Sequence, residues 1–384
     1  MTREELAPWL RLTLTPGVGP ATGRQLLTAF GLPAAIFSQP RVALENVVSR
    51  AQAAALGVMP TGFEAALTST WDWLQGAEAP ELRRRIVTLA DPGYPVALLE
   101  IADPPLLLYT LGPPHLALAD VAREHALAIV GSRNPTPQGA SDARLFARHL
   151  SQAGLTIVSG LALGIDGAAH EGALEGAPET AAATIAVVGT GLDRVYPARH
   201  RDLARRIAAR GLIVSEFALG TPPLTPNFPR RNRLIAGLTQ GTLVVEAALA
   251  SGSLITARLA AEQGREVFAI PGSIHAPQSR GCHALIRQGA KLVESTQDIL
   301  EELPALAGDT GSSATATRAT AETPEPDQED GLLAQMGYAP VSLDALCART
   351  GHDAAHLQAA LLELELMGRV GRLPGGLFQR IASA

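Results

Sequence analysis

Arginine side chains gather in one stretch of the sequence. Residues 194–233 hold nine arginines against two acidic residues, Asp202 and Glu216. At 227–233, the seven residues NFPRRNR combine three guanidinium groups, two amides and an aromatic ring. Guanidinium groups bind phosphate through paired hydrogen bonds, and an aromatic ring offers a face on which a base can stack. These residue types predict contact with single-stranded nucleic acid, and the candidates are Phe228, Arg230, Arg231, Asn232 and Arg233.

The other arginines of this stretch have a plainer interpretation. Residues 199–210 follow an amphipathic helical pattern, so we expect their arginines to be solvated and paired with nearby acids. Pro229 and its polar neighbours indicate a loop that leads into a helix at 234–239. The prediction of phosphate binding therefore depends on the loop at 227–233 and not on the arginines of residues 199–210.

Glycine-rich stretches follow several predicted strands. They are GSR at 131–133, SGLALGID at 159–166, GTGLD at 189–193 and PGS at 271–273. Glycines let a backbone approach a phosphate, and ligands of parallel sheets bind at the carboxyl ends of strands. We expect Arg133 to converge on the groove of the arginine loop. None of the stretches forms a complete GxGxxG fingerprint with a later acidic residue, so each is weak as a dinucleotide site.

Composition excludes several classes of protein. The only lysine, Lys291, does not lie in a GxxxxGK[ST] motif, which excludes a P-loop NTPase. Cys282 and Cys347 lie too far apart for a CxxC pair, and two cysteines make no disulfide framework. No 18-residue apolar run and no apolar leader is present, so we expect a cytoplasmic protein without a membrane span. The formal net charge of −6 argues weakly against nucleic-acid binding. The distribution of charge along the chain is more informative than this total.

The middle of the chain alternates buried-strand and helix patterns. Near-continuous Val and Ile runs are typical of strands that are covered on both faces. They recur about every 25–30 residues with helical stretches between them, which predicts βαβ units and a doubly wound parallel sheet of the Rossmann type. The runs lie at 127–131, 155–160, 184–189, 212–216, 242–246 and 266–272.

Two smaller domains are expected to flank this α/β core. Residues 1–82 read as short helices at 6–14, 20–31, 42–56 and 61–74, and the turn TPGVGP at 15–20 suits either a helix-hairpin-helix phosphate site or a plain helical hairpin. Residues 308–330 lack large apolar side chains and predict a flexible linker after a core at 83–307. Residues 331–384 predict a winged-helix domain with helix caps at Ser342 and Asp353, which serves either duplex DNA or protein docking.

Taken together, the motifs resemble the DprA/Smf family of DNA-processing proteins. The resemblance covers about residues 90–305, and the flanking domains agree with those of many members. It is carried by Tyr94-Pro95, DPP at 103–105, IVGSR at 129–133, IVSGLA and GID at 157–166, GTGLDRVYP at 189–197, FPRRNR at 228–233, SGSLITA at 251–257 and IPG at 270–272.

This resemblance implies an extended Rossmann fold without a cofactor, a metal site or catalytic residues. It implies a homodimer that binds and protects incoming single-stranded DNA in natural transformation, and that loads RecA in place of single-strand-binding protein. The family's DNA pocket carries over to Ser132, Arg133, Phe228, Arg230, Arg231, Asn232 and Arg233, to which we add Gly160, Ser273 and Lys291. His283 stands where the family usually has Asn, and relatives carry more lysine around the groove.

Other constellations support weaker hypotheses. Asp166 and His170 lie four residues apart on one helix face, where a capping or packing role is favoured over acid–base chemistry. Gly241, Thr242 and Glu246 match half of the PGGxGTxxE motif of lysine-decarboxylase-like nucleoside-monophosphate phosphoribohydrolases, but the PGG half is missing. That enzyme class remains the alternative function.

Overall fold

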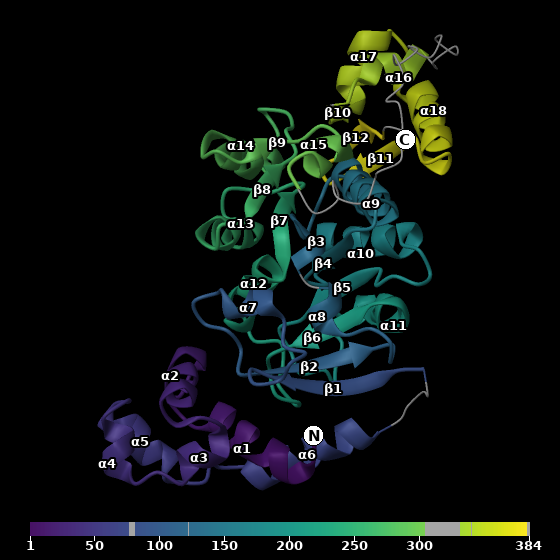
Figure 1. Ribbon diagram of the computed structural model, residues 1–384. Coiled ribbons are helices and arrows are strands. Elements are labelled where there is room, and N and C mark those ends of the chain that lie inside the picture. The colour runs from purple at the N-terminus through teal and green to yellow at the C-terminus, as the bar shows by residue number, and fades with distance from the viewer. Residues whose placement is uncertain (77–80, 122, 304–330, 339, 382–384) are drawn as a thin grey trace, which may run out of the picture.

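The computed structural model describes residues 1–76, 81–121, 123–303, 331–338 and 340–381. The predicted linker at 308–330 lies outside these residues. A nine-stranded sheet forms the centre of the molecule, with the N-terminal helices beyond one edge and a small C-terminal domain beside its helical layer (Figure 1). No helix among the described residues is both long and apolar enough to cross a membrane.

Seven strands of the large sheet run parallel to one another, and two antiparallel strands extend one edge. Their order is β1-β2-β6-β5-β4-β3-β7-β8-β9. All six predicted strand runs are confirmed, whereas β1, β2 and β9 were not predicted. The strands are β1 Arg83–Thr88, β2 Leu107–Gly112, β3 Arg123–Val130, β4 Thr156–Ser159, β5 Thr184–Val187, β6 Leu212–Ser215, β7 Thr239–Val244, β8 Glu266–Ala269 and β9 Lys291–Leu292.

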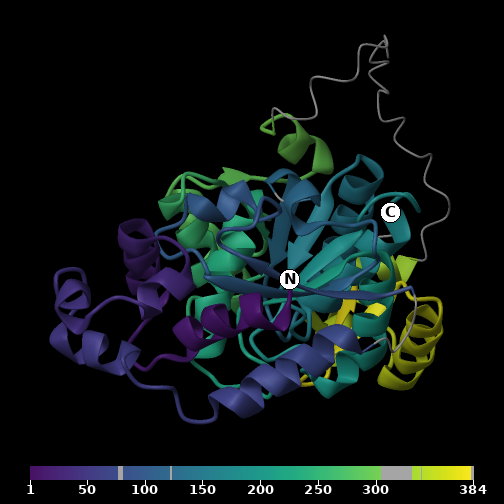
Figure 2. The ribbon, with the colours of Figure 1, turned by 60° about the horizontal axis from the view of Figure 1, so that its bottom comes forward.

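Helices cover both faces of this sheet (Figure 2). Strands β4, β5 and β6 are buried along their whole length, as near-continuous apolar runs require. The sheet therefore has the doubly wound, mainly parallel arrangement that the sequence predicts. The helices are α7 Val96–Leu99, α8 Leu118–Val121, α9 Pro137–Gln152, α10 Ile165–Gly176, α11 Arg201–Arg210, α12 Asn227–Gly237, α13 Ser253–Glu262, α14 Arg280–Arg287 and α15 Thr296–Leu300, with 3-10 turns at Ala198–His200 and Pro277–Ser279.

The order of strands reverses between β3 and β7. From β3 the chain builds outward through β4, β5 and β6, and then returns to add β7, β8 and β9 on the other side. Loops on the two sides of such a switch point leave the sheet in opposite directions and open a crevice at the carboxyl ends of the strands. The topology therefore places a ligand crevice after β3 and β7.

The N-terminal helices share their core with the edge of the sheet. Leu6, Leu26 and Trp73 of the helices belong to the same buried cluster as Leu107 and Tyr109 of β2. The single helix predicted at 42–56 is wrong in one respect. The helix is interrupted at 46–49, and a second helix begins after a capping box at Ser49. The helices are α1 Arg3–Leu14, α2 Pro20–Phe30, α3 Pro33–Phe37, α4 Arg41–Glu45, α5 Arg50–Leu56 and α6 Phe63–Gln75.

The C-terminal domain is a winged helix with its own small core. The predicted caps are confirmed: Ser342 accepts a hydrogen bond from the backbone N–H of Ala345, and Asp353 accepts one from His356. Its three-stranded sheet has the order β10-β12-β11. The elements are α16 Gly331–Met336, β10 Val341–Ser342, α17 Leu343–Thr350, α18 Ala354–Leu366, β11 Val370–Leu373 and β12 Leu377–Arg380.

Candidate nucleic-acid interface

A cavity of about 620 Å³ lies at the switch point of the sheet. One wall is the loop after β3 and the opposite wall is the segment after β7 that leads into α13, while α12 closes the side between them. A smaller hollow of about 90 Å³ shares Arg133, Tyr196, Phe228 and Arg231 with it and reaches the backbone at Gly160. Of the predicted residues, the two hollows bring together Ser132, Arg133, Gly160, Phe228, Arg231 and Asn232.

Two aromatic rings and a guanidinium group lie together in the lining of this cavity. The guanidinium carbon of the exposed Arg133 lies 5.5 Å from the ring centroid of Phe228. The ring of Tyr196 lies 5.8 Å from that of Phe228, at an interplanar angle of 35°, and Tyr196 is 47% exposed. The site therefore presents a positive charge beside a stacking surface. Tyr196 was missing from the predicted site, although it follows a glycine-rich strand end, which is the signal that points to it.

Phe228 is held by a helix, not by the predicted loop. Residues 227–233 form the first turns of α12, so the expectation of a loop before a helix at 234–239 is wrong. Pro229 fits there because the first N–H groups of a helix have no intrahelical partner, and its fixed φ suits the helix. Asn227 donates a hydrogen bond from its side chain to the Gly189 carbonyl, 3.1 Å away, which fixes the start of the helix against the end of β5.

Arg231 points into the protein and joins the ends of β4 and β5. Its Nη1 donates to the carbonyl oxygens of Gly160, 2.6 Å away, and Val187, and its Nε donates to Asn232 Oδ1 at 2.9 Å. Asp166 Oδ2 lies 4.0 Å from Nη2. Burial lowers the pKa of the Arg231 guanidinium to about 10, while the Asp166 carboxylate acts to raise it. Nε and Nη1 of Arg231 therefore donate their hydrogen bonds to the protein itself.

Arg233 leaves the helix on the side away from the cavity. Its Nη2 lies 2.6 Å from Glu216 Oε2, and its Nε lies 2.8 Å from Asp103 Oδ2. Burial acts to lower the pKa of Arg233, but the two carboxylates outweigh it and hold that pKa above its usual value. Arg233 thus ties α12 to the segment after β6 and to the loop before β2.

Arg230 and Asn232 complete the predicted motif in different ways. Arg230 is exposed, and its guanidinium carbon lies 5.3 Å from the ring of Phe217, outside the lining of the cavity. Asn232 lines the cavity and donates to the Gly252 carbonyl at 3.3 Å. Within one motif, therefore, Phe228 and Asn232 face the cavity, Arg230 faces solvent nearby, and Arg231 and Arg233 serve the fold.

The loops around the cavity are fixed by their own hydrogen bonds. Asp166 accepts from the backbone N–H groups of Gly160 and Ala162, at 3.1 and 3.2 Å, so it holds the loop after β4 and does not cap α10, whose N-cap is Gly164. Burial raises the pKa of Asp166. Glu246 accepts from the backbone N–H and the hydroxyl of Thr136, at 2.9 and 2.6 Å, and so holds the start of α9. These contacts set the backbone of the cavity walls.

His170 lies on α10, as Asp166 does, and is fully buried. Its Nδ1 lies 2.7 Å from the Thr184 hydroxyl, which in turn donates to the Ile157 carbonyl. Burial lowers the pKa of His170 to about 3, and the positive groups of His200 and Arg231 act in the same direction. The packing role predicted for His170 is confirmed.

The comparison with known proteins agrees with this geometry. The sequence profile of the DNA recombination-mediator protein A family matches residues 85–304, more than half of the chain. The chain belongs to this family. A second profile, of the DprA winged-helix domain, matches residues 315–376.

Relatives of the family resemble the chain in sequence and in structure. Protein Smf of Escherichia coli K12 is 44% identical over 295 residues, which are 74% of this chain and 74% of that protein. The X-ray structure of DprA from Streptococcus pneumoniae matches with a TM-score of 0.65 and 36% identity, over 79% of this chain and 98% of that one. DprA from Helicobacter pylori, described for its single-stranded DNA binding mode, matches with a TM-score of 0.50 and 33% identity, over 57% and 95%.

Two of the residues predicted to bind DNA lie away from the switch-point cavity. Ser273 is exposed in the loop after β8, and its hydroxyl accepts from the backbone N–H of His275. Lys291 Nζ lies 2.7 Å from Glu302 Oε1, and this contact raises the pKa of Lys291. Neither residue lines the hollows at the switch point, because β8 and β9 carry them toward the far edge of the sheet.

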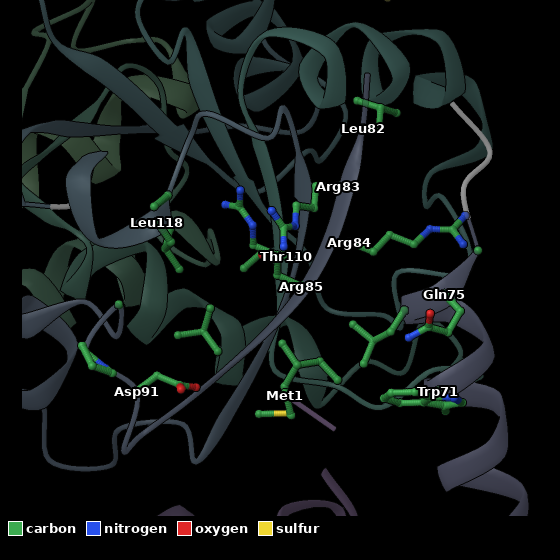
Figure 3. A pocket seen from close by; sticks show the side chains of 17 residues that line it. Met1, Trp71, Gln75, Leu82, Arg83, Arg84, Arg85, Asp91, Thr110 and Leu118 are labelled. Carbon is green, nitrogen blue, oxygen red and sulfur yellow. The ribbon is translucent and has the colours of Figure 1, made fainter. Parts of the chain in front are cut away.

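A second cavity, of about 600 Å³, lies between the N-terminal helices and edge strand β1 (Figure 3). Arg83, Arg84 and Arg85 line it together with Trp71 and Asp91. Arg84 donates to the Trp73 carbonyl at 3.0 Å, and Arg85 donates to the carbonyls of Leu116 and Pro114. Arg84 and Arg85 thus hold the neighbouring backbone in place, and this cavity contains none of the predicted site residues.

Proposed function

We propose that this protein is a single-stranded-DNA-binding recombination mediator. It binds incoming DNA at the switch-point cavity, protects it, and loads RecA onto it in place of single-strand-binding protein during natural transformation. It acts as a homodimer. The observation that carries the proposal is the exposed Arg133 beside the rings of Phe228 and Tyr196, at the carboxyl ends of parallel strands. Membership of the DNA recombination-mediator family supports it, as does the similarity to the Helicobacter pylori protein.

The binding mechanism follows from what each exposed group can offer. A base stacks on Phe228 or Tyr196, because every base has a π face and stacking needs no particular sequence. Arg133 neutralises the adjacent phosphate, and the exposed Arg230 meets the strand where it leaves the cavity. The peptide groups of the loop at 131–134 approach the backbone of the DNA. Duplex DNA hides its base faces, so single strands are preferred.

Fluorescence anisotropy with a labelled dT oligonucleotide and a matching duplex tests the proposal. We expect preference for the single strand, and at least a tenfold loss of affinity for both Arg133→Ala and Phe228→Ala. Across a NaCl titration, Arg133→Ala should flatten the slope of log K against log salt by about 0.7, the value of one phosphate contact, whereas Phe228→Ala should keep the slope. Arg205→Ala is the matched control, since Arg205 is an exposed arginine on α11.

The same variants test whether the loading of RecA depends on DNA binding at this cavity. The readout is the ATPase activity of RecA on DNA that single-strand-binding protein already covers. We expect wild type to shorten the lag before hydrolysis, and Arg133→Ala and Phe228→Ala to lengthen it in proportion to their loss of DNA affinity. Variants that bind DNA poorly and still load RecA normally would contradict the proposed site. Unaltered DNA binding in both variants would remove the cavity from the mechanism.

The proposal is for a binding protein without catalytic activity. Glu246 is the acidic residue on which the phosphoribohydrolase alternative depends, and its carboxylate accepts two hydrogen bonds from Thr136. Glu246 therefore has a structural role, because it holds the loop after β3 in position. Incubation with nucleoside monophosphates should release no free base above the buffer blank. Release of base that Glu246→Gln abolishes would favour the alternative enzyme.

A further inference from the structure

Helix α18 occupies the recognition-helix position of the winged-helix domain but lacks the charge for that task. In DNA-binding domains of the helix-turn-helix type, the second helix of the motif enters the major groove. Here that helix is Ala354–Leu366, with the sequence AAHLQAALLELEL. It contains no lysine or arginine and two glutamates, Glu363 and Glu365. Carboxylates on this helix would repel the phosphates that flank the groove.

The wing of this domain is also engaged within the protein. Strands β11 and β12 lie against α9 of the large domain, and a Cβ at Gly371 would clash with the ring of Pro137 (Figure 1). Arg372 Nη2 lies 3.7 Å from Glu365 Oε2, and the guanidinium group of Arg372 lies over the ring of Phe378. The hairpin that would reach along a DNA duplex is therefore turned toward the protein.

The outward face of α18 carries large apolar side chains instead. Leu362 is 52% exposed, Leu366 is 82% exposed and Met367, directly after the helix, is 60% exposed. Leu357, Leu361 and Leu364 are buried on the inner face, so the domain core does not account for the outer leucines. Leu362 and Leu366 are four residues apart and lie one above the other on the helix. A hollow of about 430 Å³, partly lined by Glu363 and Met367, opens beside them.

The two glutamates flank this apolar ridge. At 100° per residue, Leu362 and Leu366 lie within about 40° of each other, while Glu363 and Glu365 lie about 80° to either side of their midline. An apolar ridge with one glutamate on either side is complementary to a segment with apolar side chains between lysines or arginines, although Glu365 also lies near Arg372. We propose that the outer face of α18, formed by Leu362, Leu366, Glu363 and Glu365, docks a basic amphipathic helix of another protein.

The protein's own segments are poor occupants of this face. Two copies of α18 would bring glutamates together. Residues 308–330 contain no large apolar side chain to cover the ridge. The basic helix α11 directs its apolar residues Leu203 and Ile207 into the core of the large domain. A partner protein of opposite charge is therefore the occupant that fits.

The test uses the full-length protein and two fluorescein-labelled helical peptides. One carries leucines at helical spacing flanked by lysines, with alanine elsewhere, and the other has glutamate in place of each lysine. We expect the basic peptide to bind at least tenfold more tightly than the acidic one. Leu362→Ser/Leu366→Ser should lose at least tenfold in affinity for the basic peptide, and Glu363→Lys/Glu365→Lys should reverse the preference. Leu32→Ser, at an exposed leucine of the N-terminal domain, is the control.

Three results would overturn this inference. The first is equal binding of both peptides, or of the basic peptide by wild type and the serine double variant. The second is duplex DNA affinity that falls in the serine double variant and not in the control. The third is a drop in mass by sedimentation equilibrium in that variant, which would make a second copy the occupant. Because both leucines are exposed, unchanged circular dichroism and melting temperature are expected and show that the variants are folded.

Discussion

Replacement of Arg231 by methionine tests whether this arginine serves the fold or the ligand. Methionine keeps an unbranched chain but cannot donate hydrogen bonds, so the carbonyls of Gly160 and Val187 lose their donor. The buried Asp166 carboxylate also loses its neighbouring positive charge. A buried acceptor without a partner costs about 1–3 kcal/mol, and removal of one member of a buried ion pair costs about 3–5 kcal/mol. These losses overlap, so we expect about 4 kcal/mol of lost stability.

Thermal unfolding followed by circular dichroism measures this loss. For a domain of roughly 200 residues, 1 kcal/mol corresponds to about 2–4 °C, so the melting temperature should fall by about 8–16 °C. Arg133→Met should melt within about 2 °C of wild type, because Arg133 is exposed. Arg205→Met, which removes an exposed ion pair with Asp202, is the second control.

One result would refute the reasoning about Arg231. If Arg231→Met melts like wild type and loses affinity for single-stranded DNA, the guanidinium is available to ligand and its contacts with strand ends carry little energy. If the variant instead melts early and, below its transition, binds DNA about as well as wild type, the structural role stands. Urea unfolding gives an independent value of the stability change.

Further changes have distinct signatures. Arg233→Gln leaves the buried Glu216 without its partner, so calorimetry should show a loss of about 3–5 kcal/mol in unfolding free energy. The pKa of His170 is about 3 when folded against 6.5 in the unfolded chain, so the unfolded state binds the extra proton between these values. Stability should therefore fall by up to about 1.4 kcal/mol per pH unit as pH decreases below 6.5, and His170→Gln should remove this contribution in urea titrations. Gly164→Ala should lower both the melting temperature and DNA affinity, since Gly164 has a φ of +81° and an added Cβ would clash with the Ser132 carbonyl.

Each of these expectations has a clear contrary outcome. Equal calorimetric stability of wild type and Arg233→Gln would mean that Glu216 is solvated. An identical pH dependence in wild type and His170→Gln would assign the acid sensitivity to other groups. Normal affinity in Gly164→Ala, despite a lower melting temperature, would show that the loop after β3 binds DNA without its observed backbone.

The sequence predicted the sheet well because buried parallel strands leave an unmistakable pattern. Continuous apolar runs such as TIVS and TIAV have few alternatives between turns, and helix caps at Ser342 and Asp353 follow from local hydrogen bonding. Edge strand β1 was missed because it begins with three arginines, Arg83, Arg84 and Arg85, which read as a polar boundary. It forms a strand because all six of its residues pair with β2, and Ile86 packs in the core shared with the N-terminal helices.

The candidate site was predicted less completely, for a geometric reason. In a loop, Arg230, Arg231 and Arg233 could all turn to one side, whereas successive residues of a helix point about 100° apart. Because the motif is helical, its arginines separate into one exposed and two buried side chains. Tyr196 is remote in sequence from Phe228, so only the folded chain shows the two rings together.

The core shared by the N-terminal helices and the sheet bears on how the chain can be divided for experiments. Trp73 of α6 meets Tyr109 of β2 edge to face, with 5.8 Å between ring centroids, and Ile86 and Leu107 are buried in the same cluster. A truncation that starts at residue 83 would expose Ile86, Leu107 and Tyr109 as a continuous apolar surface beside edge strand β1, and exposed surfaces and edges of this kind associate with other chains. Fragments of the sheet domain alone should therefore aggregate, and the first 82 residues belong in any soluble expression fragment.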